Sequence, residues 1–236
     1  MAQTHHFDAI LFDMDGTLVD STAGVVGAWE VFSQTYPHID VHDILSSAHG
    51  VRTVENLRVH CGITDPDELE REAERFEDAI ITSADQDGKS GIVRLPGVEE
   101  IMKNLRPGAK FPKPVWAICT SATRKYANAA LSAAGIEPPE AFVAAEDVEK
   151  GKPAPDPYLL GAKRCGVDPK RCLVVEDAPA GVRSGNTAGC KTLALLTSHT
   201  RAQVEAASPT FIAKDLSSVS MTISANGGVD VTIKTE

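Results

Sequence analysis

Short apolar runs and longer amphipathic segments alternate along most of this chain. The first run, residues 7–12, is apolar at all but one position and predicts a buried strand. Later runs predict further strands at 115–119, 141–145, 172–175 and 192–196. Segments typical of helices lie among them at 97–105, 123–134, 157–165 and 180–188. This alternation predicts a parallel sheet covered by helices on both faces.

A helical block interrupts this alternation after the first strand. Val25, Trp29 and Phe32 recur at helical spacing behind a typical N-cap, Asp20-Ser21. Asp65-Pro66 opens a second helix with an apolar face, and a polar stretch at 85–91 is typical of a linker. We therefore expect an α/β fold with two domains. The core comprises residues 1–19 and 91–236, and a helical cap of residues 20–90 is inserted after the first strand.

The two ends of the chain carry weaker patterns. His5-His6 lies before the first apolar run, and we expect it to belong to a flexible start. At the other end, alternating residues 229–233 follow Asn226-Gly227-Gly228 and predict the last strand of a hairpin.

Composition and charge narrow the class of protein. The 236 residues carry a formal net charge of -10, which disfavours nucleic acid as a partner. No apolar run approaches the ~20 residues of a membrane-spanning helix, so we expect no membrane partner. The five cysteines lack CxxC spacing and are typical of reduced thiols in a cytoplasmic protein. We also expect a monomer, because no long apolar surface stripe stands out.

Polar residues follow the predicted strands, at the sheet edge where α/β proteins bind ligands. They are Asp13, Asp15, Thr120, Ser121, Lys152, Glu176 and Asp177. Four carboxylates in one crevice repel one another, and a divalent cation relieves that repulsion. Ligands that are all oxygen favour Mg²⁺, which also binds substrate phosphate. One carboxylate can attack phosphorus while another moves protons, and a hydroxyl and an ammonium can stabilise the transition state.

Four segments resemble the motifs of the haloacid dehalogenase superfamily of phosphohydrolases. They are FDMDGT at 12–17, Ser121 after VWAICT, GKPAPDPY at 151–158 and VVEDAPAGVRSGNTAGC at 174–190. The helical block resembles the small cap of the subfamily that includes phosphoglycolate phosphatase and β-phosphoglucomutase. HGVRT at 49–53 and EDAPAG at 176–181 resemble the fungal glycerol-phosphate and 2-deoxyglucose-6-phosphate phosphatases.

The resemblance implies a fold, an activity and a cofactor. The fold is a Rossmann-like parallel sheet core with a small helical cap. The activity is Mg²⁺-dependent hydrolysis of a small phosphomonoester, such as a sugar, polyol or glycerol phosphate, through an aspartyl-phosphate intermediate.

The resemblance also implies catalytic roles for matching residues. Asp13 is the nucleophile and a metal ligand, while Asp15 is the general acid/base and offers its backbone carbonyl to the metal. Ser121 hydrogen-bonds the phosphoryl group, and Thr120 is the alternative hydroxyl if the motif is aligned one residue earlier. Lys152 stabilises the nucleophile and the pentavalent centre.

The remaining implied roles are metal and substrate binding. Asp177 binds the metal directly, and Glu176 binds it directly or through water. The implied substrate-binding positions are Thr17, Ala122, Arg52 and His49.

Other activities of the same superfamily fit the sequence less well. The dehalogenases lack the second aspartate, which is present here as Asp15, and the mutases carry a histidine where this chain has Val25. A phosphotransferase or phosphomutase of the same superfamily and a catalytically silent phosphate-binding scaffold stay open as alternatives. A scaffold needs neither a nucleophile nor metal carboxylates.

Overall fold

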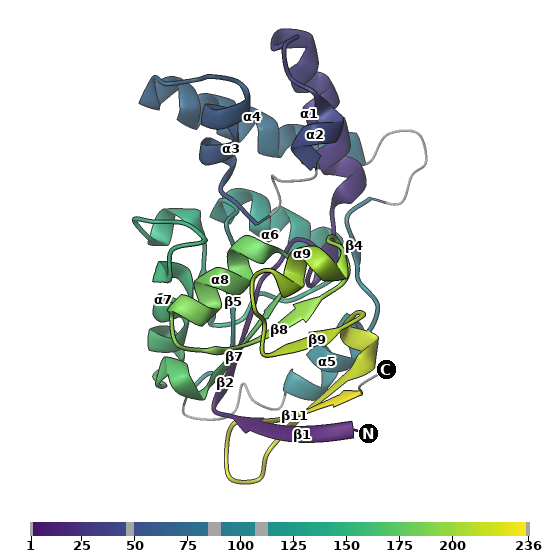
Figure 1. Cartoon of the computed structure of the whole chain (residues 1–236), viewed down its shortest axis with the longest axis vertical. Helices are drawn as coiled ribbons and strands as arrows, with labels where there is room; N and C mark the ends of the chain where they lie inside the picture. The colour runs from purple at the N-terminus through teal and green to yellow at the C-terminus, as the bar shows by residue number, and fades with distance from the viewer. Residues whose placement is uncertain (1, 46–49, 85–90, 107–112, 235–236) are drawn as a thin grey trace.

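Six parallel strands form the central sheet of the structure (Figure 1). The structure is a computed structural model, and it describes residues 2–45, 50–84, 91–106 and 113–234. Their order across the sheet is β6-β5-β2-β7-β8-β9. Their bounds are β2 Ala9–Phe12, β5 Trp116–Cys119, β6 Ala141–Val143, β7 Cys172–Glu176, β8 Lys191–Leu195 and β9 Phe211–Ala213. The predicted parallel sheet is therefore confirmed, with β2 at its centre between β5 and β7.

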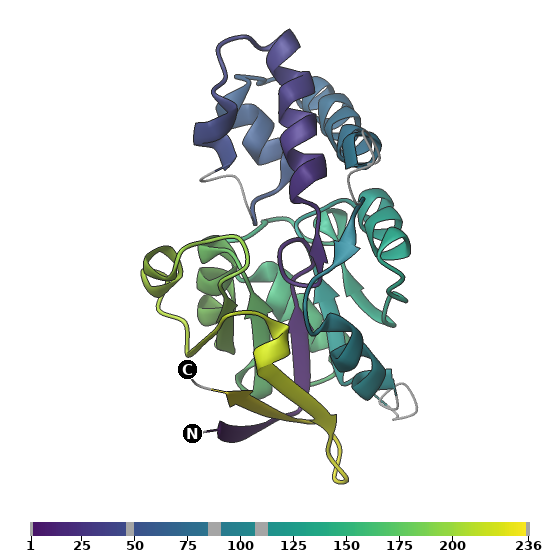
Figure 2. The same cartoon turned by 90° about the vertical axis from the view of Figure 1, so that its right-hand side faces the viewer.

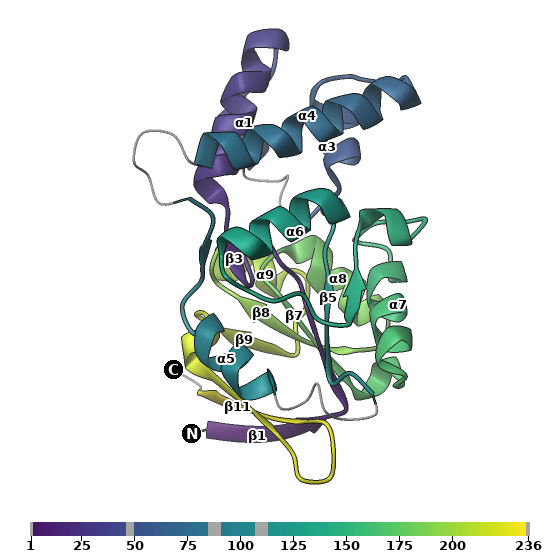
Figure 3. The same cartoon turned by 180° about the vertical axis from the view of Figure 1, so that it is seen from behind.

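Both faces of the sheet are covered, as the alternating pattern predicted (Figures 1 and 3). Along β2, Ile10 and Phe12 join one buried apolar cluster, whereas Ala9 and Leu11 join another. Successive side chains of a strand point to opposite faces, so these clusters lie on opposite sides of the sheet. The helices that cover the sheet are α5 Val98–Leu105, α6 Arg124–Ala133, α7 Asp156–Cys165, α8 Pro179–Thr187 and α9 Arg201–Glu205.

The helical block predicted after the first strand is present as four helices, here called the helical insert. They are α1 Thr22–Thr35, α2 Val41–Leu45, α3 Thr53–His60 and α4 Pro66–Ala84. The insert lies beyond the carboxyl ends of the sheet strands (Figure 2). Its core is aromatic: Phe76 of α4 meets Trp29 and Phe32 of α1 at ring-centroid distances of 4.5 and 5.0 Å. These rings belong to the same buried apolar cluster as Ile10 and Phe12 of the sheet, so the insert packs on the sheet unit through shared apolar contacts.

Two short strands join the insert to the sheet. β3, Val19–Asp20, directly precedes the insert, and β4, Val93–Arg94, follows it. The two strands pair antiparallel. The Asp20 side chain accepts a hydrogen bond from the Thr22 backbone N–H at 3.0 Å, which supports the predicted start of α1.

The N-terminal segment is ordered, so the expected flexible start is wrong. β1, Ala2–Phe7, pairs antiparallel with β11, Val229–Lys234, which also pairs with β10, Val219–Ile223. The predicted terminal hairpin is thus confirmed, and it provides the edge that β1 uses. The apolar run at 7–12 is accordingly divided between two sheets, with Asp8 at the break.

The other predicted strands and helices match the structure closely, except at one strand end. The strand predicted at 141–145 ends at Val143, because Ala145–Asp147 forms a 3₁₀ turn. Two further 3₁₀ segments among the described residues are Pro169–Arg171 and Leu216–Ser218. Within the part of the chain that the structure describes, no helix combines the length and apolar character needed to cross a membrane.

The aromatic core of the insert provides a test of its packing. Phe32 is fully buried, whereas its neighbour Val31 on the same helix is 39% exposed. Phe32→Ala should lower the free energy of unfolding by about 3–5 kcal/mol, because it leaves a cavity against Phe76. Val31→Ala is the matched control and should cost far less. Urea denaturation of both variants measures this, and equal losses would contradict the packing described here.

Candidate active site

Neighbouring strand ends bring three carboxylates together. Phe12 of β2 lies beside Val175 of β7, so Asp13 and Glu176 follow at adjacent positions. The Asp13 backbone N–H donates to the Val175 carbonyl at 2.9 Å, which fixes this register. Asp13, Glu176 and Asp177 are all buried, and each offers a carboxylate oxygen within 4.8 Å of the other two. Three negative charges are thereby confined to one small volume.

A buried lysine forms ion pairs with two of these carboxylates. Lys152 has no exposed surface, and its Nζ donates to Asp13 Oδ1 and, at 2.7 Å, to Glu176 Oε1. Burial acts to lower the pKa of Lys152, but the charges of Asp13 and Glu176 outweigh that effect and raise it above its ordinary value. Lys152 therefore stays an ammonium and offsets part of the negative charge.

Glu176 is held by further donors around its carboxylate. The buried Tyr158 hydroxyl donates to Oε1 at 2.7 Å. The backbone N–H groups of Asp177 and Ala178 each donate to Oε2 at 3.0 Å. A Cβ at Gly181 would lie only 1.6 Å from Oε1, so the first turn of α8 needs glycine there. The orientation of Glu176 is thus determined by its surroundings.

Asp177 is held by hydroxyls from two loops. Thr17 donates to its Oδ1 at 3.3 Å, and Ser198, after β8, donates to its Oδ2. Gly16 has φ +79, and a Cβ there would lie 2.2 Å from Asp177 Oδ2. The absence of a side chain at Gly16 therefore lets the loop after β2 pass close to this carboxylate.

Burial and mutual repulsion disfavour the ionised forms of this cluster. Burial, together with the smaller effect of the charge of Glu176, raises the pKa of Asp177 to about 7. Burial also raises the pKa of Asp13 well above its usual range, although Lys152 opposes the shift. A divalent cation would favour the ionised carboxylates over the protonated ones. The donor set, which is buried, close together and all oxygen, fits Mg²⁺.

Asp15 lies in the same loop but turns its side chain away from the three carboxylates. Its Oδ1 accepts hydrogen bonds from the Ser21 hydroxyl at 2.6 Å and from the Tyr126 hydroxyl at 2.9 Å. Ser21 is thus not the side-chain cap of α1 that the sequence suggested. Asp15 is placed to exchange protons in the cavity above Asp13, and its role in acid/base catalysis stays a prediction.

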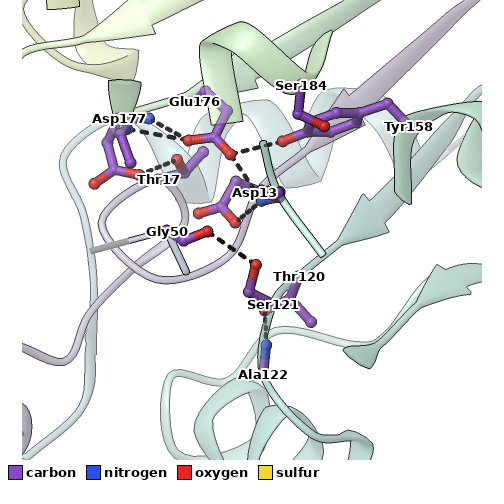
Figure 4. A network of polar contacts seen from close by, with 12 residues as sticks. Asp13, Thr17, Gly50, Thr120, Ser121, Ala122, Tyr158, Glu176, Asp177 and Ser184 are labelled. Atoms are coloured by element: carbon purple, nitrogen blue, oxygen red, sulfur yellow. Dashed lines mark hydrogen bonds and ion pairs between the residues drawn. The ribbon is translucent and has the colours of Figure 1, made fainter. Parts of the chain in front are cut away.

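The two hydroxyls that follow β5 are used differently. Thr120 is buried, and its Oγ1 accepts a hydrogen bond from the Ala122 backbone N–H at 3.0 Å. The Ser121 hydroxyl instead donates to the Gly50 carbonyl of the insert at 3.0 Å (Figure 4). Both residues and Ala122 line the cavity beside Asp13. Which of these groups contacts a phosphoryl oxygen stays a prediction.

A small cavity of about 100 Å³ lies between the carboxyl ends of the strands and the helical insert. Its sheet side carries Asp13, Asp15, Ser121 and Tyr126. Its insert side is largely apolar. The lining residues there are Val25, Trp29, Leu45, Gly50, Val51, Thr53, Asn56, Phe76, Glu77 and Ile80. A ligand bound here would touch both parts of the structure.

The two predicted cap residues have different outcomes. The Arg52 guanidinium donates to the carbonyls of Ala145, Val148 and Glu149 at 3.0, 2.6 and 3.1 Å, and Arg52 is not among the residues that line the cavity. Here Arg52 joins the insert to the sheet unit, and its contact with substrate stays a prediction. His49 lies outside the described residues.

Several polar groups of the site were not singled out from the sequence. They are Ser21, Glu77, Tyr126, Tyr158, Thr197 and Ser198. Tyr158 had one usable signal, because a tyrosine in an apolar helix face needs a partner for its hydroxyl. Ser198 had none, because it contacts Asp177 only through the loop after β8.

Comparison with known proteins identifies the family. Residues 7–189 match the haloacid dehalogenase-like hydrolases. Hexitol phosphatase A of Escherichia coli is 40% identical over 185 residues, which cover 78% of this chain and 81% of that protein. Glycerol-1-phosphate phosphohydrolase 2 of Saccharomyces cerevisiae is 34% identical over 197 residues, 80% of this chain and 75% of that protein.

A solved structure agrees with this result. The crystal structure of a hydrolase from Pseudomonas syringae matches with a TM-score of 0.74 at 26% identity, covering 89% of this chain and 94% of that chain. The chain belongs to the haloacid dehalogenase-like hydrolase family, and the resemblance read from its four motifs is confirmed.

The raised pKa values predict how metal affinity depends on pH. Asp177 has a pKa of about 7, so protons compete with a cation below that value. Because the cation must displace one such proton, the affinity for Mg²⁺ should be about tenfold lower at about pH 6 than at about pH 8. Isothermal titration at both pH values measures this.

The same shift predicts the stability of the metal-free protein. An acid whose pKa is raised by folding stabilises the folded state at low pH, and that contribution is lost as pH rises through about 7. Added Mg²⁺ should therefore raise the melting temperature more at about pH 8 than at about pH 6. An equal increase at both pH values would contradict the assignment of Asp177 as a ligand.

Proposed function

We propose that this protein is a Mg²⁺-dependent phosphatase that hydrolyses the phosphomonoester of a small sugar or polyol through an aspartyl-phosphate intermediate. The observation that carries the proposal is the buried cluster of Asp13, Glu176 and Asp177 with Lys152, whose member Asp13 lines the cavity between the sheet and the insert. The named activities of the hexitol and glycerol phosphate relatives support the substrate class.

The residues of the chain divide the reaction between them. The Asp13 carboxylate attacks phosphorus, the bond from phosphorus to the alcohol oxygen breaks, and Asp15 gives that oxygen a proton. Asp15 then takes a proton from water, whose oxygen attacks the phosphorus of the aspartyl phosphate. That step releases inorganic phosphate and restores Asp13. Lys152 keeps Asp13 oriented and supplies positive charge.

The carboxylates of Asp13, Glu176 and Asp177, together with the Asp15 backbone carbonyl, would hold the metal. When bound, Mg²⁺ neutralises charge on the phosphoryl oxygens and keeps the carboxylates ionised. Ser121 and the Ala122 amide are the proposed phosphoryl contacts, with Thr120 as the alternative hydroxyl. Thr17, Arg52 and His49 keep their proposed roles in binding substrate.

One observation favours hydrolysis over phosphoryl transfer within a sugar. Val25 of the insert faces the cavity, and its side chain has no proton to donate or accept. The mutases of the superfamily carry a histidine at the matching position. Water is therefore the proposed acceptor, activated by Asp15 alone.

Further proposals concern the setting of the enzyme. We propose that residues 20–90 act as a cap domain on a core of residues 1–19 and 91–236. We also propose a cytoplasmic monomer. The five cysteines are free and buried, and the exposed large apolar residues Val31, Val59, Val93 and Leu159 are scattered over separate elements.

The nucleophile provides the first test of this proposal. Asp13→Asn should lower kcat by at least about 10³-fold, because the amide cannot form the covalent intermediate. Asp8→Asn is the matched control: it makes the same change at a surface residue paired with Arg171, and activity should persist. Steady-state release of phosphate from an aryl phosphate measures both, and an active Asp13→Asn enzyme would rule out the covalent route.

Asp15 is tested by a different signature. Asp15→Asn should slow turnover by about 10²–10⁴-fold while leaving Asp13 able to react. With an aryl phosphate, whose leaving group needs little protonation, phosphorylated enzyme should accumulate. Acid quenching and mass spectrometry detect this species, and its absence from a slow variant would count against Asp15 as the base for the second step.

A further inference from the structure

Glu77 is a buried carboxylate of the cavity to which the mechanism above gives no role. It lies on α4 of the insert, is 4% exposed and lines the cavity opposite the phosphoryl-transfer residues. Its neighbours in the lining include the apolar side chains of Phe76 and Ile80. A carboxylate in such surroundings is costly to bury unless hydrogen bonds compensate it.

The hydrogen bonds of Glu77 leave part of its acceptor capacity unused. Oε1 accepts from the Thr53 hydroxyl at 3.0 Å and from the Thr123 backbone N–H at 3.3 Å. Oε2 accepts from the Thr123 hydroxyl. A carboxylate has about four acceptor positions, so Oε2 retains one. That position suits a donor such as a hydroxyl of a bound molecule.

The charges around the cavity favour a neutral ligand end. Among the described residues that line it, none is a lysine or an arginine, whereas Asp13, Asp15 and Glu77 are acidic. Burial and, to a smaller extent, the charge of Asp15 raise the pKa of Glu77, and the hydrogen bonds from Thr123 and Thr53 limit that rise. A second anionic group placed beside Glu77 would lose its water there, and no described lining residue of the cavity would offer it a positive charge.

We propose that Glu77 determines specificity: it accepts a hydrogen bond from a hydroxyl of the substrate and excludes substrates that carry a second anionic group. The inference rests on the proposed phosphatase activity and deepens it. The substrate class it defines is the monophosphate of a neutral polyhydroxy compound. Bisphosphates and phosphorylated hydroxy acids are rejected, because like charges in a desolvated cavity repel strongly.

Two matched pairs of compounds test this selection. Glycerol 3-phosphate and 3-phosphoglycerate differ only in a terminal hydroxymethyl or carboxylate group, and sorbitol 6-phosphate and 6-phosphogluconate differ in the same way. The quantity measured is the ratio of kcat/KM for the neutral and anionic members of a pair. For the wild-type enzyme, this ratio should be at least about 100 in the pair that it hydrolyses better.

Glu77→Gln removes the charge and keeps the shape of the side chain. It should lower the ratio at least about tenfold, because the neutral substrate loses a charge-assisted hydrogen bond and the anionic one loses a repulsion. Turnover of an aryl phosphate, which has neither group, should change less than turnover of the neutral polyol phosphate. Thermal unfolding checks that the variant is folded.

Two control variants separate selection from structure. Glu74→Gln makes the same charge change one turn earlier on α4, where the side chain is exposed, and should leave the ratio unchanged. Thr53→Val removes a hydrogen bond to Glu77 but keeps the carboxylate, so the ratio should persist even where KM rises. A ratio that falls with Thr53→Val as much as with Glu77→Gln would assign Glu77 a purely structural role.

The outcomes distinguish this inference from the proposed function. A wild-type protein that hydrolyses neither pair nor an aryl phosphate would overturn the phosphatase proposal itself. A wild-type protein that hydrolyses them, with a ratio that Glu77→Gln leaves unchanged, would overturn the role of Glu77 alone. A ratio lowered by Glu77→Gln and unchanged in both controls supports it.

Discussion

The burial of one ammonium among three carboxylates is the constraint on which the rest of the site depends. Lys152 is completely buried, and the protein interior tolerates its charge only because Asp13 and Glu176 accept its hydrogen bonds. The carboxylates in turn exceed that single positive charge. A bound cation would therefore stabilise the ionised form of the cluster by balancing the remaining negative charge. Placing β2 next to β7 in a parallel sheet is what brings these groups together.

Backbone space is the second requirement of the site. A side chain at Gly181 would overlap the carboxylate of Glu176, and a side chain at Gly16 would overlap that of Asp177. Both glycines belong to segments that resemble the family motifs. Their role here is steric: each removes a Cβ so that a helix turn or a loop can pass close to a carboxylate oxygen. The position of these two carboxylates thus requires glycine at both positions.

Polar contacts connect the helical insert to the sheet unit around the cavity. Ser121 donates to the Gly50 carbonyl, Arg52 donates to carbonyls after β6, and Glu77 accepts from Thr123. The aromatic side chains of the insert, around Phe76, belong to the same buried apolar cluster as Phe12 and Ile118 of the sheet. Both hydrogen bonds and apolar contacts therefore hold the insert against the sheet, and the cavity lies within this boundary.

Short-range patterns in the sequence were enough to predict most of the fold and the central chemistry. The apolar runs located the sheet strands, and acidic residues directly after β2 and at the end of β7 located the cluster, because strand ends determine which residues share an edge. Asp13, Glu176 and Asp177 therefore needed no tertiary information, and the resemblance to the family motifs added Lys152. The start of the chain was predicted wrongly, since β1 depends on pairing with β11, more than 200 residues later.

Tertiary structure alone decided which other side chains meet these residues. Tyr126 reaches Asp15, Ser198 reaches Asp177, and Glu77 reaches Thr123, each from an element distant in the sequence. Arg52 was placed in the cavity by resemblance, yet its hydrogen bonds run to backbone carbonyls after β6. Sequence periodicity reports which face of an element is apolar, and it carries no information about the partner that packing brings to a polar group. The sequence by itself therefore determined the chemistry at the strand ends, and the packing of the insert against them decided the shape and polarity of the space in which that chemistry takes place.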